Sequence, residues 1–122
     1  MLLSNSKAQL AFDYALESGY LLVSENTLFE FRSVLSRSKF ERYKSLTERL
    51  FFYEIFVQSV QIVNIVEKVT ECRDPKDNKF LEVAVNGKAD TIVSGDSYLL
   101  ILHPFRGIEI LSVNDFLAGA AQ

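Results

Sequence analysis

Residues 72–96 read CRDPKDNKFLEVAVNGKADTIVSGD and predict a helix followed by a short buried strand. Asp74-Pro75 is typical of a helix start, because proline is tolerated at the first helical position, and we expect this helix to stop at Gly87. Thr91–Val93 then forms a short apolar strand, which the polar residues 94–96 close. A helix that leads directly into a buried strand is typical of a crossover unit in a parallel sheet.

The same alternation of helical and strand-like segments extends over the rest of the chain. The other ranges predicted as helices are 7–18, a segment after Ser24 that reaches Leu35, about 47–59, 97–102 and 112–118. The other ranges predicted as strands are 20–23, 61–66 and 108–111. This alternation predicts one α/β domain over residues 1–122, with a mainly parallel sheet that helices cover on both faces.

The composition excludes several kinds of chemistry. The 122 residues include one cysteine and one histidine, which excludes an internal disulfide, a cysteine-rich zinc site and any reaction that needs a histidine pair. No apolar run is long enough for a signal peptide or a membrane span, so we expect a cytoplasmic protein without a membrane partner. The formal net charge of −3 provides no overall attraction to nucleic acids.

Three carboxylates are placed to reach one edge of the predicted sheet. In a parallel sheet, functional sites form beyond the carboxyl ends of the strands, where the following helices begin. Asp96 follows the strand Thr91–Val93, Asp77 lies in the first turn of the helix opened by Asp74, and Glu30 lies two turns into an earlier helix. Grouped carboxylates repel one another and favour a hard cation, so we expect Mg²⁺ or Mn²⁺ and phosphodiester hydrolysis without a histidine.

Each acid also has a purely structural interpretation. Asp74 is most simply a helix N-cap, and the spacing favours a capping role for Asp77 as well. For Asp96, capping of the following turn and a role in a site are about equally supported. Glu30 taken alone would be a solvated helix residue.

A basic stretch lies between the second and third predicted helices. Its cations are Arg32, Arg37, Lys39, Arg42, Lys44 and Arg49, with Phe40 and Tyr43 between them. The charges could follow an RNA backbone, and this interpretation stays open, whereas the two aromatic side chains are expected to point into the core. His103 is expected to be a structural loop residue, and Cys72 a small, partly buried one.

Residues 72–84 and 89–96 together closely resemble the C-terminal half of PIN-domain proteins. Residues 22–40 and the ending 107–117 resemble the same branch of that family, the toxin components of toxin–antitoxin pairs (VapC-like ribonucleases). The resemblance covers nearly the whole chain. It implies a three-layer α/β/α fold, a Mg²⁺- or Mn²⁺-dependent endoribonuclease activity, RNA as substrate, an antitoxin protein as partner and self-association.

The resemblance also assigns the site residues. Glu30 matches the second acid of the family's quartet, Asp77 matches the third and Asp96 matches the fourth. Asp74 is a possible auxiliary metal ligand, and Ser94 matches a hydroxyl residue two positions before the fourth acid. The resemblance and the placement of residues in the predicted sheet therefore point to the same three carboxylates.

The first acid of the quartet, with its strand, is expected to be missing, because Met1–Lys7 resembles the region that follows it in the family. Asp13 is not a substitute, since it lies inside the first helix. A start codon assigned too late, a truncation that abolished activity and a strand supplied by a partner chain all stay open. The alternatives to a ribonuclease are a non-catalytic PIN-like interaction module and another carboxylate-based phosphatase or nuclease.

Overall fold

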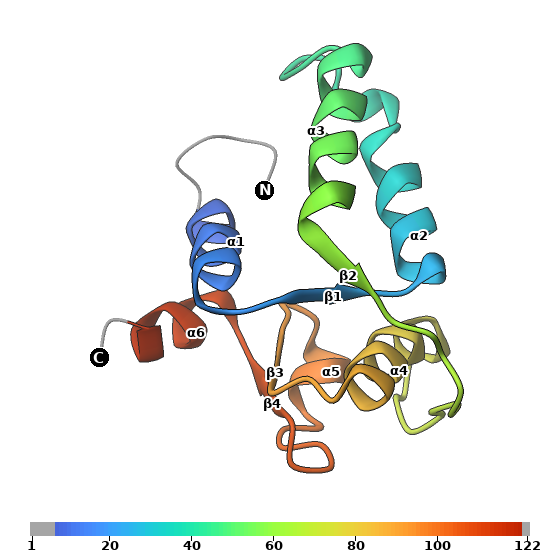
Figure 1. Ribbon diagram of the computed structural model, residues 1–122, viewed down its shortest axis with the longest axis vertical. Helices are drawn as coiled ribbons and strands as arrows, with labels where there is room; N and C mark the ends of the chain where they lie inside the picture. Colours follow the sequence, from blue (N-terminus) through green and yellow to red (C-terminus); the bar gives the residue numbers. More distant parts are fainter. Residues whose placement is uncertain (1–6, 121–122) are drawn as a thin grey trace.

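The computed structural model describes residues 7–120, as α-helices, short 3₁₀ turns and short strands (Figure 1). The α-helices are α1 (Lys7–Ser18), α2 (Glu25–Leu35), α3 (Leu46–Ser59), α4 (Asn78–Gly87), α5 (Ser97–Leu100) and α6 (Val113–Ala120). The 3₁₀ turns are η1 (Ser38–Phe40) and η2 (Pro75–Asp77). The strands are β1 (Leu21–Val23), β2 (Val60–Ile62), β3 (Thr91–Val93) and β4 (Glu109–Leu111). The prediction about the first strand of the family concerns residues 1–6, which lie outside the described range.

The strands pair in parallel, which confirms the predicted α/β class. β1 pairs with β2, with Leu22 opposite Gln61, and β3 pairs with β4, with Ile92 opposite Ile110. The described strands form two separate two-stranded sheets, whereas the sequence predicted one. α4 contacts both β1 and β3, so this helix joins the two sheets.

Helices lie on both sides of the strands in Figure 1. The α2–α3 hairpin projects from one side of β1 and β2, while α4 and α5 lie on the other side. α1 packs against α6, and Tyr14 meets Phe116 edge to face with ring centroids 5.6 Å apart. Phe31 of α2 packs against Phe52 and Phe56 of α3, and Phe12 of α1 stacks on Phe56. These aromatic contacts hold α1, α2 and α3 together.

The helix starts that the sequence predicted are confirmed. Ser24 caps α2 in a capping box with Thr27, and the Ser45 hydroxyl accepts a hydrogen bond from the Glu48 amide at the start of α3. Asp74 caps η2 and accepts a hydrogen bond from the amide of Lys76, as its structural interpretation predicted.

α4 ends at Gly87, as the sequence predicted. The residue that takes the left-handed backbone conformation after it is Lys88, with φ of 55°. Glycine is needed at position 87 because the helix packs closely against its neighbours there. A Cβ at this position would lie 2.8 Å from Leu22 Cδ1 and 2.8 Å from Val63 Cγ2. The glycine therefore lets α4 approach β1 and the end of β2.

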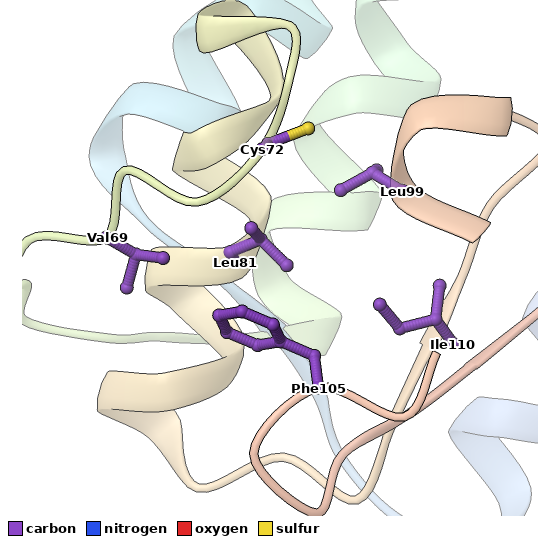
Figure 2. Close-up of a cluster of buried hydrophobic side chains, with 6 residues drawn as sticks. All are labelled: Val69, Cys72, Leu81, Leu99, Phe105 and Ile110. Carbon is purple, nitrogen blue, oxygen red and sulfur yellow. The ribbon is translucent and has the colours of Figure 1, made fainter. Parts of the chain in front are cut away.

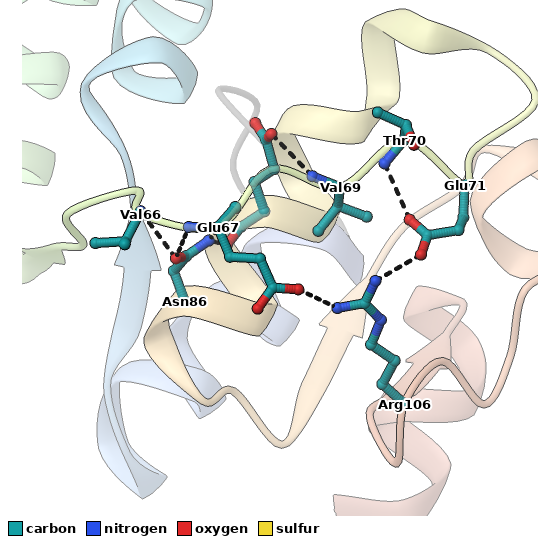
Figure 3. A network of polar contacts seen from close by, with 8 residues as sticks. Val66, Glu67, Val69, Thr70, Glu71, Asn86 and Arg106 are labelled. Atoms are coloured by element: carbon teal, nitrogen blue, oxygen red, sulfur yellow. Dashed lines mark hydrogen bonds and ion pairs between the residues drawn. The ribbon is translucent and has the colours of Figure 1, made fainter.

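The strand predicted over 61–66 is shorter in the structure. Beyond Val63 the backbone leaves the sheet, because α4 side chains take up its amides in place of a neighbouring strand. The amides of Val66 and Glu67 donate to Asn86 Oδ1 at 2.9 and 2.8 Å (Figure 3). The amide of Val69 donates to Glu82 and that of Cys72 donates to Asn78.

Arg106 fastens the same segment from the other side. Its guanidinium donates to the carboxylates of Glu67 at 2.6 Å and Glu71 at 2.5 Å, as Figure 3 shows. His103, close by in the same loop, accepts a hydrogen bond from the Ile110 amide at Nδ1, which confirms its structural role.

A compact core lies between α4, α5 and β4 (Figure 2). Its buried members are Val69, Cys72, Leu81, Leu99, Phe105 and Ile110. Leu81 has no exposed surface at all, and it lies one turn after the start of α4. The core therefore fixes the N-terminal end of α4, which follows Asp77 directly. No helix within residues 7–120 is long and apolar enough to cross a membrane.

Candidate active site

The acids predicted from the sequence come from three separate elements. Glu30 lies in α2, Asp77 lies at the junction of η2 and α4, and Asp96 lies at the start of α5, directly after β3. Asp96, Asp74 and Glu30 are all close enough to Asp77 to raise its pKa electrostatically. The structure therefore brings the predicted acids to one region.

In the described part of the chain, one side-chain oxygen of Asp77 is buried without a partner. It occupies the N-cap position of α4 but its side chain makes no capping hydrogen bond, so the capping role that its spacing favoured is wrong. Within the described residues, Asp77 Oδ2 is the one buried side-chain oxygen or nitrogen without a hydrogen-bond partner. A buried and unsatisfied oxygen destabilises the fold, and such atoms are typical of functional sites.

The pKa of Asp77 is raised from 3.8 to about 6. Desolvation is the largest cause, because burial disfavours the charged form, and the neighbouring Asp96 carboxyl is the next. The raised pKa of Asp77 beside a second carboxyl indicates a region of concentrated negative charge. Such a region is suited to bind a cation or to take up a proton.

Asp96 is both a capping residue and a neighbour of Asp77. Its Oδ1 accepts a hydrogen bond from the amide of Tyr98 at 2.8 Å, which confirms the capping interpretation. Its own amide donates to the Ser94 hydroxyl at 3.0 Å. Ser94 therefore fixes the backbone of Asp96, and Asp96 keeps its orientation toward Asp77 through two local hydrogen bonds.

Glu30 is paired with a cation of the chain itself. Lys79 Nζ, from the first turn of α4, lies 2.6 Å from Glu30 Oε1, with side chains 17% and 41% exposed respectively. Lys79 was not among the residues predicted from the sequence. The signal that could have identified it is its position two residues after Asp77, in the first turn of α4.

The donor chemistry of these acids suits Mg²⁺ or Mn²⁺, because all of the donors are carboxylate oxygens. Within residues 7–120, however, no three His, Cys, Asp or Glu side chains are grouped closely enough to enclose a metal ion. Asp77, whose Oδ2 has no partner in that range, and the adjacent Asp96 can contact a cation from one side. Within the described residues, no third acid is close enough to complete the coordination. The assignment of Glu30, Asp74, Asp77 and Asp96 as metal ligands, and of Ser94 as a catalytic residue, stays a prediction.

Two further side chains border the acids. The Arg73 guanidinium lies 5.9 Å from the centre of the Tyr98 ring, and both residues are exposed. The Cys72 thiol is buried, as predicted, and its hydrogen bond runs to the Tyr98 carbonyl oxygen. Burial raises the pKa of Cys72, and the neighbouring acids raise it further, so the thiol stays protonated at neutral pH.

The basic stretch separates into two parts. Arg49 is 1% exposed and donates to the carbonyl oxygens of Leu35, Arg37 and Lys44, so this cation has a structural role. The other cations are exposed. The prediction that both aromatic side chains point inward is wrong for Tyr43, which is 53% exposed, whereas Phe40 is half-buried.

The chain was compared with known families and proteins. A family model described as a PIN domain matches residues 1–97, a range that contains Glu30, Asp74, Asp77, Ser94 and Asp96. No curated protein and no solved structure matches the chain.

Proposed function

The chain belongs to the PIN-domain family, and from this membership we propose that it is a metal-dependent endoribonuclease. PIN domains are nuclease-type folds that generally depend on a divalent metal ion. The observation that supports the proposal most directly is Asp77 Oδ2, which is buried and has no hydrogen-bond partner in the described chain. Because Asp77 neither caps its helix nor pairs with a cation, its position beside Asp96 is best explained by a chemical role.

Asp77 and Asp96 would hold a Mg²⁺ or Mn²⁺ ion, with Glu30 and Asp74 nearby. A divalent ion held there would neutralise charge on the phosphodiester and activate water. In the chain without a metal ion, desolvation and the neighbouring Asp96 raise the pKa of Asp77 to about 6, so this carboxyl holds a proton more readily than an ordinary carboxylate.

The surrounding residues position the acids. Ser94 and the amide of Tyr98 hold Asp96 through two hydrogen bonds, and Lys79 holds Glu30. The buried core beneath α4 keeps Asp77 in its turn, since Leu81 follows it by four residues and is fully buried. Preorganised acids of this kind lower the cost of ordering the site when substrate binds.

We further propose that the protein is the toxin of a toxin–antitoxin pair that acts in the cytoplasm, with an antitoxin protein and a second copy of the chain as partners. The support is the resemblance of residues 72–96 to that branch of the family. Co-purification of the chain with the product of the neighbouring gene tests the antitoxin, and light scattering of the purified chain tests self-association.

The ribonuclease itself is tested with an RNA whose two ends are chemically blocked, so that only internal cleavage is measured. We expect the wild-type chain to cleave this RNA with Mg²⁺ or Mn²⁺ and not with EDTA. Asp77→Asn and Asp96→Asn are expected to lower the rate by roughly a hundredfold or more, because each removes a charge from the site. Asp90→Asn is the matched control, since Asp90 is exposed and lies outside the site.

Calorimetry with Mn²⁺ separates the enzyme from the interaction module. Binding by the wild-type chain that Asp96→Asn weakens supports the proposal. Cleavage that is unaffected by EDTA or by Asp77→Asn would contradict it, and so would a wild-type chain that binds no Mn²⁺ and cleaves no RNA.

A further inference from the structure

A basic tip connects α2 to α3 at the far end of their hairpin (Figure 1). We define the basic tip as residues 36–45. It contains the four cations Arg37, Lys39, Arg42 and Lys44 against one acid, Glu41, in a chain whose formal net charge is −3. The positive charge is therefore concentrated on one short, exposed segment of an acidic protein.

The basic tip is held in one conformation by a buried side chain. Arg49 donates from Nη1 to the carbonyl oxygens of Leu35 and Arg37 and from Nε to that of Lys44 at 3.1 Å. These bonds fix both ends of the tip to the start of α3. Within it, the backbone continues through η1, and the amides of Tyr43 and Lys44 both donate to the carbonyl oxygen of Phe40. The backbone from which the cations of the tip project is therefore held in place.

The cations are exposed and carry few competing partners. Lys39 lies 5.3 Å from the Phe40 ring centre, and the Arg42 guanidinium lies 5.6 Å from that of Tyr43. An ion pair joins Lys44 of the tip to Glu48, at 3.9 Å between two exposed side chains, and such pairs are weak. Most of the positive charge is therefore available to an external anion.

Apolar surface adjoins the charge. Tyr43 is 53% exposed and Phe51 is 65% exposed. Beside the tip lies a groove of about 250 Å³, lined by Lys44, Glu48, Arg49, Phe51, Phe52 and Ile55. Cations next to exposed aromatic rings are the features that bind single-stranded nucleic acid, because phosphates meet the charges and bases stack on the rings.

We propose that the basic tip is a binding site for the backbone of single-stranded RNA, separate from the acids that cleave it. This inference rests on the proposed ribonuclease function, which makes RNA the polyanion to consider first. About 8 Å of helix axis separates Glu30 from Leu35, where the tip begins. One RNA strand can therefore contact the tip while another part of it reaches the acids.

The test measures RNA binding separately from cleavage. Fluorescence anisotropy with a labelled single-stranded RNA of about 20 nucleotides, in EDTA, gives the affinity at salt concentrations between about 50 and 200 mM. The triple variant Arg37→Gln, Lys39→Gln, Arg42→Gln is compared with the control triple Lys7→Gln, Lys68→Gln, Lys88→Gln. All six side chains are exposed, and both triples lower the net charge equally.

We expect the tip variant to bind RNA roughly tenfold or more weakly than the wild-type chain at low salt. The slope of log affinity against log salt should fall by about 2, because each phosphate contact of a single strand contributes about 0.7. The control triple is expected to keep a slope close to that of the wild-type chain. Equal slopes for the two triples, or a wild-type chain that does not bind RNA at low salt, would overturn the inference.

Two parallel measurements make each failure specific. A polyglutamate peptide of similar charge tests whether an acidic protein is the occupant. If this peptide binds as tightly as RNA and the tip variant loses that binding, the assignment to RNA is overturned. Cleavage of end-blocked RNA with Mn²⁺ tests the proposed function. If the chain cleaves RNA but the tip variant binds RNA as tightly as the wild-type chain, the tip proposal alone is wrong. If the tip variant binds RNA more weakly but the wild-type chain does not cleave it, the ribonuclease proposal alone is wrong.

Discussion

Lys79 Nζ lies 2.6 Å from Glu30 Oε1 and joins the first turn of α4 to α2. An acid that the sequence predicted as a metal ligand is therefore already paired with a cation of the same chain. Because Lys79 is two residues from Asp77, its positive charge also opposes the entry of a second cation into the region of the acids. The pair consequently sets both the position of Glu30 and the affinity of the site for metal.

Replacing Lys79 tests this relationship. We expect Lys79→Gln to bind Mn²⁺ about three- to tenfold more tightly than the wild-type chain, since a competing positive charge is removed and Glu30 is released. The effect on stability should stay below about 1 kcal/mol, because the Glu30 side chain is 41% exposed. Calorimetry measures the affinity, and Lys88→Gln, at an exposed position beyond the other end of α4, is the control. Weaker binding in Lys79→Gln would show instead that Lys79 organises the ligands.

Asp77 predicts how stability depends on pH. Its pKa is about 6 in the folded chain against an ordinary value of 3.8, so the folded state binds more protons between these pH values and stability falls as pH rises through them. We expect Asp77→Asn to be more stable than the wild-type chain near pH 8 in EDTA. The difference should shrink as pH falls through 6 toward 4, where Asp77 becomes protonated.

Urea unfolding at several pH values measures this difference, with Asp90→Asn as the exposed control. A stability gain in Asp77→Asn that stays constant from about pH 4 to 8 would contradict the assigned pKa. Addition of Mn²⁺ should reverse the order of stability at pH 8, because the wild-type chain alone then gains binding energy from the ion.

Arg49 is expected to be among the most sensitive positions for stability. Arg49→Lys keeps the charge but loses the planar guanidinium, and one ammonium cannot serve all three carbonyl oxygens that Arg49 now binds. We expect a loss of about 2–5 kcal/mol, since buried carbonyls are left without donors. Arg42→Lys, at the exposed surface of the same hairpin, should change stability by less than about 0.5 kcal/mol. Similar losses for the two variants would refute the structural role of Arg49.

Two helical glycines should respond in opposite directions to alanine. Gly119→Ala in α6 is expected to stabilise the chain by up to about 1 kcal/mol, because nothing lies within 4 Å of the added Cβ. Gly87→Ala in α4 is expected to destabilise it by about 1–3 kcal/mol, because the Cβ would meet Leu22 and Val63 at 2.8 Å. Thermal unfolding of the two variants measures both signs, and stabilisation by Gly87→Ala would show that α4 can move away from β1.

Local sequence patterns predicted the helices and the parallel pairing correctly. The capping serines, the apolar strands and the helix ending at Ser18 are signals carried by neighbouring residues, and the structure confirms each of them. The same local signals were misleading where contacts between residues far apart in the sequence determine the role of a side chain. Asp77 has the spacing of a cap, yet burial and Asp96 determine its state.

Arg49 and Gly87 show the same limit. Arg49 was predicted as one more exposed cation, because its sequence neighbours do not reveal that it binds the backbone carbonyls of Leu35, Arg37 and Lys44. Gly87 was predicted as the end of its helix and is that end, but the sequence did not reveal that its lack of a Cβ also permits close contact with β1 and the end of β2. The division into two sheets likewise depends on how α4 lies between β1 and β3, which spacing along the chain does not encode.

The lengths of the connections between paired strands have a consequence for the order of folding. β3 meets β4 after a short excursion through α5, whereas β1 meets β2 only after the whole α2–α3 hairpin has formed. Closing the shorter loop costs less chain entropy, by about 0.6 kcal/mol for each halving of length. We therefore expect the C-terminal half to assemble first and to serve as the template on which the N-terminal half condenses.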